Sequence, residues 1–313
     1  MLGTNYCLMA RSAGVPSSDW CFQFAILATT DATTVTITPS TNANLAVDSG
    51  TNHYTINLDQ GYTYEINSSN WSGDVTGTSI TSDKPIAVFA GASAAYVSYT
   101  NTYSGNPPVQ EQLPVASWGT EVLALSFADR TNGDSYRVLA ATDGTTVIVV
   151  TTNGAVTSYL QAGKFFDTIL DGWVEFQANN PIQVAQFANG CGFDNTNNNE
   201  GDPCEILLPP AGHYLSSYTI AIPTDGDFET NFLNLIVPQS AITNTYLDGA
   251  AITNFVAISG FVAITNSGYW AAQVPVAGGT NHTVSSSQPL EVQVYGFGPA
   301  DAYGYIGGVI RFR

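Results

Sequence analysis

The segment from Cys191 to Cys204 carries oxygen-bearing side chains at most of its positions. Calcium binds to about six to eight oxygen ligands in flexible geometry, so this loop has chemistry that suits the ion. The spacing differs from that of an EF-hand, and Asn and Asp in turns also bond to their own backbone. Both readings stay open, and a structural loop is favoured. The candidate calcium ligands are Asp194, Asn197, Glu200 and Asp202.

The four cysteines form two pairs that are local in the sequence. Neither pair has the close double spacing of a zinc site. Other connectivities exist, but local pairing closes small loops and is the simplest arrangement. We therefore predict disulfide bonds Cys7–Cys21 and Cys191–Cys204. Because such bonds persist in oxidising compartments, they favour an extracellular or cell-surface location.

Residues for catalysis are scattered rather than grouped along the chain. His53, His213 and His282 lie far apart, without an HExxH motif or any paired metal spacing. The small-residue stretch 91–95 lacks the second glycine of a nucleophile elbow. A glycan-cleaving enzyme needs two carboxylates across a cleft, and no acid pair recurs in such a context. We assign no catalytic residue and predict that the protein is not an enzyme.

Aromatic residues make up 12% of the chain and supply candidates for partner contact. Tyr96, Tyr99 and Tyr103 lead into a segment between two predicted modules, and connecting segments often carry function. The alternative is a loop packed on its own module. Most tryptophans are expected in the core or between modules. They are Trp20, Trp71, Trp118, Trp173 and Trp270.

The charge balance is strongly acidic, with 7 basic residues against 25 acidic ones and a net charge of -18. Nucleic acid is therefore excluded as a partner, and an anionic membrane surface is disfavoured. Calcium or a basic protein would be attracted by the same field. The longest apolar runs, 86–92 and 255–265, are too short for a spanning helix, so we predict no membrane insertion. No cofactor is predicted apart from the calcium considered above.

Alternating residues predict β-strands throughout the chain. In 33–38, Val35 and Ile37 alternate with threonines, as in a half-buried strand. The apolar run 24–28 precedes it, and the two together predict a hairpin. The pattern returns around Asp143-Gly144, a strong turn signal, and more weakly around Asp248-Gly249. Gly and Pro recur at turn spacing and no long helical period occurs, which is typical of β-sandwich modules.

Three tandem modules follow from motifs that recur in the same order. Pro85, Pro181 and Pro289 each open an apolar strand, where a missing N–H is least costly. Leu-Pro sequences in both linkers predict that the modules are held at a fixed angle in one compact unit. The predicted boundaries are module 1 at 1–100, a linker at 101–117, module 2 at 118–190, a disulfide loop and linker at 191–213, and module 3 at 214–313.

The ordered motifs resemble the IgGFc-binding protein N-terminal domain family over nearly the whole chain. The resemblance implies a secreted or cell-surface protein with a binding or adhesion role and no catalytic residues. It carries no short motif for Fc binding, so antibody binding is not predicted. The motifs are the 24–29 and 33–38 strands, the 79–89 segment, Glu111-Gln112-Leu113-Pro114 with Trp118-Gly119-Thr120, and Tyr295-Gly296-Phe297 with Tyr303-Gly304-Tyr305.

Two functions stay open beside an unsupported glycan-active enzyme. The first is a non-enzymatic adhesion or binding protein whose module loops meet a protein or glycan partner. The second is a structural subunit of an extracellular fibre, in which modules of different copies self-associate through exposed β-edges. The acidity, the repeats and the family resemblance favour the first function.

Overall fold

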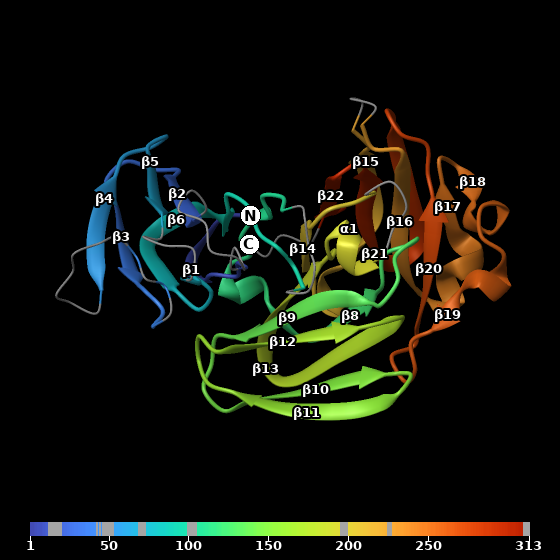
Figure 1. Ribbon diagram of the computed structural model, residues 1–313, viewed down its shortest axis with the longest axis horizontal. Coiled ribbons are helices and arrows are strands. Elements are labelled where there is room, and N and C mark those ends of the chain that lie inside the picture. Colours follow the sequence, from blue (N-terminus) through green and yellow to red (C-terminus); the bar gives the residue numbers. More distant parts are fainter. Residues whose placement is uncertain are drawn as a thin grey trace.

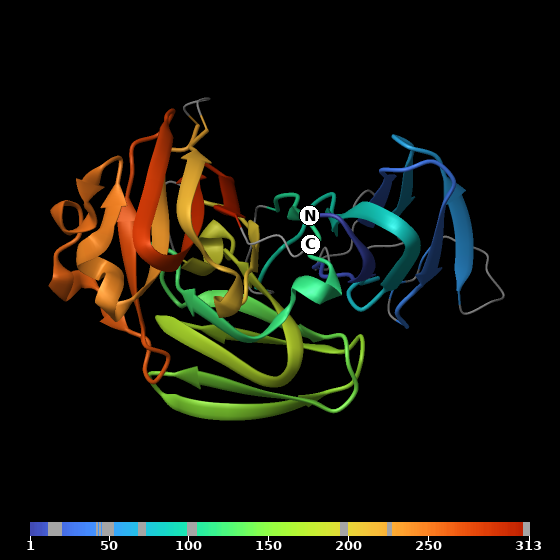
Figure 2. The ribbon, with the colours of Figure 1, turned by 180° about the vertical axis from the view of Figure 1, so that it is seen from behind.

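The computed structural model describes residues 1–11, 21–41, 43, 45, 53–67, 73–98, 105–194, 200–223 and 227–308. Nearly every regular element in these ranges is a strand, and the strands form three antiparallel sheets. Module 1 lies at the left of Figure 1, module 2 below and module 3 at the right, and Figure 2 gives the opposite view. The predicted all-β fold of three packed, sandwich-like modules is confirmed.

Seven strands build each of the first two modules. Module 1 contains β1 (Gly3–Cys7), β2 (Phe22–Ala28), β3 (Thr33–Thr38), β4 (Tyr54–Leu58), β5 (Thr63–Asn67), β6 (Ser79–Ala92) and β7 (Val109–Glu111). Module 2 contains β8 (Gly119–Leu125), β9 (Asp134–Ala140), β10 (Thr145–Thr151), β11 (Gly154–Leu160), β12 (Phe165–Leu170), β13 (Trp173–Phe187) and β14 (Glu205–Leu208).

Module 3 has one additional short strand and most of the helical turns. Its strands are β15 (Leu215–Ala221), β16 (Thr230–Pro238), β17 (Thr245–Leu247), β18 (Ala250–Ala251), β19 (Val262–Ala263), β20 (Tyr269–Pro275), β21 (Asn281–Gly298) and β22 (Asp301–Ile306). Its 3-10 turns are η4 (Gln239–Asn244), η5 (Ile252–Asn254) and η6 (Ile258–Gly260). Between the modules lie η1 (Val115–Ser117), α1 (Cys191–Asp194) and η3 (Ala211–His213).

The three sheets share one strand order. Module 1 runs β4-β3-β6-β2-β5, module 2 runs β11-β10-β13-β9-β12, and module 3 runs β18-β17-β21-β16-β20 with β19 at the edge. In each case a long strand (β6, β13 or β21) pairs additionally with the first and last strands of its module. Such a common topology requires the same connectivity three times, so the modules are copies of one unit.

Each long strand carries the same irregularity, and this corrects the predicted role of the prolines. Two residues of the first strand span five of the long strand, as in the pairs Gly3↔Ile86 and Asn5↔Thr81. The equivalent shifts occur in modules 2 and 3. Pro85, Pro181 and Pro289 lie at these bulges in the middle of the long strands, not at strand starts. A bulge leaves ladder positions unpaired, so the missing N–H is tolerated there.

The predicted hairpin between the 24–28 run and the 33–38 strand is wrong. Both segments are strands, β2 and β3, but β6 lies between them and pairs with each. The side-chain alternation fixes which face of a strand is buried, but not its neighbour. The hairpin predicted around Asp143-Gly144 is wrong for the same reason, because β13 lies between β9 and β10. The Asp248-Gly249 turn does connect a hairpin, because β17 and β18 pair across it and both turn residues have positive φ.

The connections between modules are built alike. Pro114 precedes η1 and Pro210 precedes η3, and each turn leads directly into the next module. A Cβ on Gly3 would lie 2.5 Å from the Pro114 ring, and a Cβ on Gly119 would lie 2.4 Å from the Pro210 ring. The linker proline therefore packs on the first strand of the module it leaves. The predicted linkers also contain β7 and β14, which pair with the preceding long strands; the residue boundaries stay a prediction.

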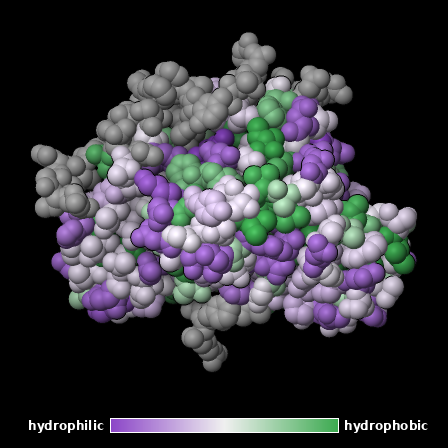
Figure 3. Space-filling model, turned by 90° about the horizontal axis from the view of Figure 1, so that it is seen from below, coloured by the Kyte–Doolittle hydropathy of each residue, from purple (hydrophilic) through white to green (hydrophobic). Residues whose placement is uncertain are grey.

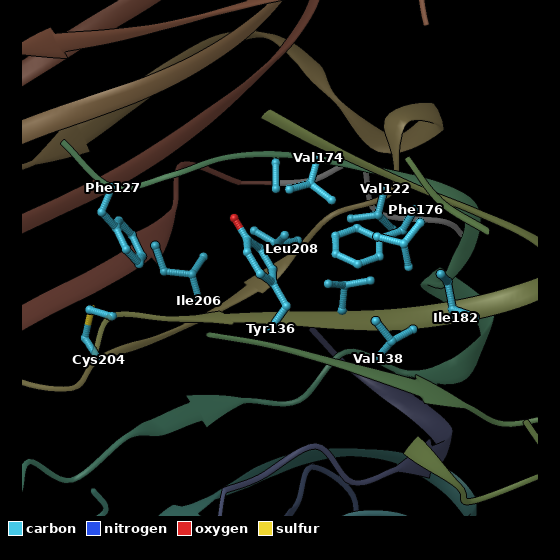
Figure 4. Close-up of a cluster of buried hydrophobic side chains, with 14 of the residues drawn as sticks. Val122, Phe127, Tyr136, Val138, Val174, Phe176, Ile182, Cys204, Ile206 and Leu208 are labelled. Carbon is cyan, nitrogen blue, oxygen red and sulfur yellow. The ribbon is translucent and has the colours of Figure 1, made fainter. Parts of the chain in front are cut away.

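Apolar side chains fill each module, and the second core extends into the third module. Figure 4 shows the core of module 2, where Tyr136, Phe176 and Ile206 lie among valines and leucines. Phe232, Tyr295 and Phe297 of module 3 belong to the same cluster. Modules 1 and 3 each have a core of their own, and three aromatic residues of module 3 extend the core of module 2.

The outer face of module 2 mixes residue types, as the view from below in Figure 3 shows. Hydrophobic residues gather near the middle of that face and hydrophilic ones surround them. No helix in the described part of the chain is long and apolar enough to cross a membrane.

Candidate binding surface at the joint of modules 1 and 2

The end of the first strand of module 1 docks on the side of module 2 formed by β9, the end of β13, and β14. Cys7 and Met9 pack in one buried cluster with Leu139 and Phe187 of module 2. Trp118, at the start of module 2, closes the same cluster, and its indole N–H donates to the carbonyl of Leu113. Apolar contact thus holds the joint, as expected for a buried interface between domains.

Arg137 joins the two modules through hydrogen bonds in both directions. Its Nε and Nη2 donate to the two carboxylate oxygens of Asp167 at 2.8 and 2.9 Å. Its Nη1 donates to Asp74 Oδ2 and to the Ala10 carbonyl, each at 2.7 Å, and to Thr76 Oγ1 at 2.9 Å. The guanidinium also lies 3.9 Å from the ring centroid of Phe165. Arginine suits this role because its planar fork binds a carboxylate in a bidentate manner.

Arg11 adds a second buried cation to the joint. Its guanidinium lies over the Phe187 ring, and its Nη1 is 3.7 Å from Asp167 Oδ1. Burial raises the pKa of Asp167, but the hydrogen bonds and charge of Arg137 outweigh it, so the pKa lies below its usual value. Asp167 is therefore a stable carboxylate that bridges two arginines.

Glu205 places a buried carboxyl group near the guanidinium groups of Arg137 and Arg11. Neither side-chain oxygen has a hydrogen-bond partner among the described residues. Burial raises its pKa to about 8, although the nearby charges of Arg137 and Arg11 counteract part of this shift. The group is largely neutral at physiological pH, which avoids an uncompensated charge in the interface.

A hollow of about 470 Å³ opens beside these charges. Its wall combines the Asp167 carboxylate, hydroxyl groups and the apolar side chains of Ile169 and Phe193. Ile169 is 46% exposed, so a bound molecule would meet an apolar rim next to a negative charge. Concave sites with apolar walls and few polar groups are typical of binding sites. The lining residues are Arg11, Ser98, Ser135, Asp167, Thr168, Ile169 and Phe193.

The hollow is lined by residues that flank three segments for which the sequence predicted a disulfide bond, partner contact or calcium binding. Arg11 precedes residues 12–20 of the predicted first disulfide loop, and Ser98 precedes 99–104 of the tyrosine tract. Phe193 lies in the predicted calcium loop, just before residues 195–199. The structure thus brings together the residues that border these segments, although they are far apart in the sequence.

The tyrosine tract is described only in part. Tyr96 is half-buried, next to a β-bridge between Ala95 and Asn106. Tyr99 and Tyr103 lie outside the described residues. The predicted role of the tract in partner contact therefore stays a prediction.

The predicted calcium loop is organised around an arginine. Arg130 Nε lies 3.2 Å from the buried Asp194 carboxylate, and its Nη1 donates to the Glu200 carbonyl at 2.8 Å. The Glu200 side chain accepts a hydrogen bond from Thr230. Asp202 is buried, and Asn197 lies outside the described residues. No group of three or more His, Cys, Asp or Glu in the described ranges is placed to hold a metal.

The structure contains no disulfide bond among the four cysteines, all of which it describes. Cys7 pairs with Ser79 at the start of β6, whereas Cys21 precedes Phe22, which pairs with Ala92 at the end. Burial raises the pKa of Cys7 to about 12, and of the Cys204 thiol likewise, which disfavours the thiolate needed for exchange. The pairings Cys7–Cys21 and Cys191–Cys204 are not confirmed and stay predictions.

The three histidines lie apart in the fold. His53 precedes β4, His213 ends η3, and His282 lies in β21. His282 Nδ1 is 2.7 Å from Asp248 Oδ2, beside the β17–β18 turn, which is a structural contact.

Sequence reasoning missed the buried arginines, of which Arg11 and Arg137 build the joint and Arg130 organises the 191–204 loop. Arg11, Arg130 and Arg137 are all largely buried, although the chain has only 7 basic residues. Burying a cation requires partners. The scarcity of basic residues, with one arginine inside the strand-like run 136–140, was a signal that could have pointed to Arg137.

Comparisons with known proteins agree with the resemblance read from the motifs. A family model described as IgGFc binding protein matches residues 1–296. The human IgGFc-binding protein is 27% identical over 240 residues, which cover 74% of this chain and 4% of that protein. A solved structure titled for the host cell surface retention of a bacterial ice-binding adhesin covers 90% of this chain and 87% of its own, at 11% identity. Its TM-score of 0.14 carries no argument.

Proposed function

Because the chain belongs to the IgGFc-binding protein family, we propose that it is a non-enzymatic, extracellular or cell-surface protein that binds a protein partner at the hollow between modules 1 and 2. The family is one of binding proteins. The chain spans 4% of the human relative, so that protein's whole activity is not carried over. The observation that carries the proposal is the hollow itself, where a carboxylate lies beside exposed apolar side chains.

The charge of the chain favours a basic partner. With a net charge of -18, the molecule attracts a basic protein over a distance and accelerates encounter. At the hollow, the Asp167 carboxylate is paired with Arg137 and Arg11 but its side chain stays 37% exposed, and Ile169 offers an apolar contact. We expect a partner that inserts an arginine or lysine beside an apolar side chain. A glycan partner lacks this charge, so it is the weaker expectation.

The test uses an exposed substitution in the hollow with a matched control. Ile169→Lys adds a positive charge at the rim, and Val156→Lys adds the same charge on the exposed edge strand β11. Immobilised wild-type chain is probed with immunoglobulin G, a panel of basic extracellular proteins and a glycan array. Immunoglobulin G is included only because the human relative is named for it.

The proposal expects at least one protein that binds the wild type and the Val156→Lys chain equally. Its affinity for Ile169→Lys should fall about tenfold or more, as hot-spot substitutions do. Equal affinities for all three chains, or binding of glycans alone, would contradict the proposed site.

A second candidate function, a fibre subunit assembled through β-edges, has one observation in its favour. Strand β11 lies at a sheet edge, contains no charged residue, and exposes Val156 and Tyr159 to 67% and 79%. Such an edge is a template for pairing with another chain. Repulsion between copies of net charge -18 opposes assembly at low salt. Sedimentation equilibrium at low and high salt, with Val156→Lys as a blocking variant, tests this candidate.

A further inference from the structure

The joint between modules 2 and 3 repeats the joint between modules 1 and 2 residue by residue. The shared register of the first strands makes Cys7 equivalent to Leu123 and Met9 equivalent to Leu125. Both pairs pack against the following module. We call this end of the first strand the docking end. Each docking end thus packs against the module that follows it in the chain.

The receiving face is equivalent in the two joints as well. The pairs Arg137↔Ala185 and Asn234↔Gln293 lie at the same position after the bulge proline. Arg137 donates to the Ala10 carbonyl, and Asn234 Nδ2 donates to the Ser126 carbonyl, which is the equivalent atom. One strand further out, Asp167 and Gln273 are equivalent, and each contacts the docked module. The contact is therefore a head-to-tail repeat.

Module 1 has the same receiving face, and none of the described residues of modules 2 and 3 covers it. By register, Ala25 and Glu65 stand where Arg137 and Asp167 stand in module 2. Phe89 and Val109 on this face are 38% and 44% exposed. Together with Gln23 and Gly91 these residues line a hollow of about 200 Å³. An equivalent surface that is buried twice in the molecule is thus left open once.

The shape of the open face differs at one position. Phe187, which lies under Arg11 in the first joint, is replaced by Gly91 in module 1. A Cβ there would lie 2.2 Å from the Pro108 carbonyl oxygen. The glycine lets Pro108 and Val109 lie against the strand, and the hollow beside Phe89 lies next to them. The open face therefore has room for an apolar side chain.

The charge on the open face indicates what fits it. In the first joint, Asp167 receives Arg11, which follows the docking end of module 1. Glu65 holds the equivalent position in module 1 and faces solvent. A strand end that is apolar and followed by a basic residue would fill this hollow with an apolar side chain and place its cation beside the Glu65 carboxylate. This is the chemistry of residues 7–11 of the chain itself.

The described residues of a second copy of this chain do not offer that chemistry, because residues 7–11 are already held in the first joint. The docking end of module 3 has Pro223 where module 1 has Arg11. Among the described basic residues the arginines are engaged within joints, Lys84 donates to the carbonyls of Asp31 and Ala32, and Lys164 is exposed. Two copies of net charge -18 also repel.

We infer that the receiving face of module 1, formed by Ala25, Glu65, Phe89, Gly91 and Val109, is a docking site for another protein module. It takes an apolar strand end that is followed by arginine or lysine. The site lies apart from the hollow beside Ile169, so the result of its test is independent of the proposed function. Its repeated counterparts within the chain define the geometry of the contact.

The probe is a synthetic peptide with the sequence of residues 5–11 carrying Cys7→Ser, and the control peptide carries Arg11→Glu in addition. Each is titrated to about 2 mM into the isotopically labelled full chain, and amide shifts are recorded by NMR. Saturable shifts are expected at Ala25, Glu65 and Phe89 with the arginine peptide. The glutamate peptide should bind about tenfold more weakly. No saturable shift on this face would overturn the inference.

Charge reversal separates local contact from the field of the whole molecule. Glu65→Lys should weaken binding of the arginine peptide about tenfold and strengthen binding of the glutamate peptide. Asp171→Lys makes the same change in net charge in module 2 and should have little effect. Equal losses in both variants would mean attraction by the overall charge alone and overturn the site. Self-association of the wild type that Glu65→Lys abolishes would overturn the choice of occupant in favour of a second copy.

Discussion

Replacing Arg137 by methionine should open the joint of modules 1 and 2. The substitution keeps much of the side-chain volume but removes five hydrogen bonds, two to Asp167 and one each to Asp74, Thr76 and the Ala10 carbonyl. Removing one partner of a buried ion pair costs about 3–5 kcal/mol, because the other charge stays uncompensated.

The two carboxylates left behind decide where in that range the effect falls. The Asp167 side chain is 37% exposed, so water can solvate its freed charge. Asp74 is 12% exposed and keeps most of the penalty. We therefore expect a loss of about 3 kcal/mol, near the lower limit for a buried pair.

Native-state hydrogen exchange measures how often this joint opens. The amides of Met9 and Ala10 donate to Gln112 Oε1 and Thr76 Oγ1 on their own side of the joint. Because the joint buries Met9, and because Arg137 binds the Ala10 carbonyl and Thr76 Oγ1, opening of the joint should expose both amides to solvent and loosen their hydrogen bonds. A loss of about 3 kcal/mol corresponds to exchange on the order of 100-fold faster. Lys164→Met, at an exposed cation, should change these rates little. An acceleration under threefold for Arg137→Met would refute the reasoning that this arginine holds the joint.

Three further outcomes follow from the packing and the buried acids. Burial raises the pKa of Glu205 and of Glu291 to about 8 from 4.5, so the stability that the neutral groups provide is fully present below about pH 4.5 and is lost as pH rises through about 8. Thermal melting should therefore occur at lower temperature at about pH 9 than at about pH 6, and a rise would contradict the burial of neutral carboxyls. Gly119→Ala should destabilise by about 1–3 kcal/mol, because its Cβ would meet the Pro210 ring, whereas Gly212→Ala, with nothing within 4 Å, should be tolerated; equal denaturant midpoints for the two variants would exclude this contact. Calorimetric titration of the full chain with calcium should give no binding heat if Arg130 is the resident cation of the 191–204 loop, while heat and a higher melting temperature would restore the calcium reading.

The sequence was informative wherever a pattern is local. Alternation identified strands such as Thr33–Thr38, and the recurrence of proline-led apolar segments identified three copies of one unit. The sequence did not show which strands pair with each other. β2 and β3 are close in sequence, yet each pairs with β6, which is remote from both.

The joint could not be predicted from one sequence for a related reason. Arg137 lies in a strand whose seven residues are all buried, and the burial of a cation depends on Asp74 and Ala10 in another module. Only a three-dimensional arrangement brings these groups together. The same holds for the hollow, whose lining comes from separate segments of modules 1 and 2.

Hydrogen–deuterium exchange of the chain, alone and saturated with the protein partner identified by binding, tests the proposed function most directly. We expect slower exchange in the partner-bound chain at β12 and around Phe193, which line the hollow between modules 1 and 2. The edge strand β11 should exchange at an unchanged rate. Protection confined to β11 or to module 3, with β12 unaffected, would contradict the placement of the binding site.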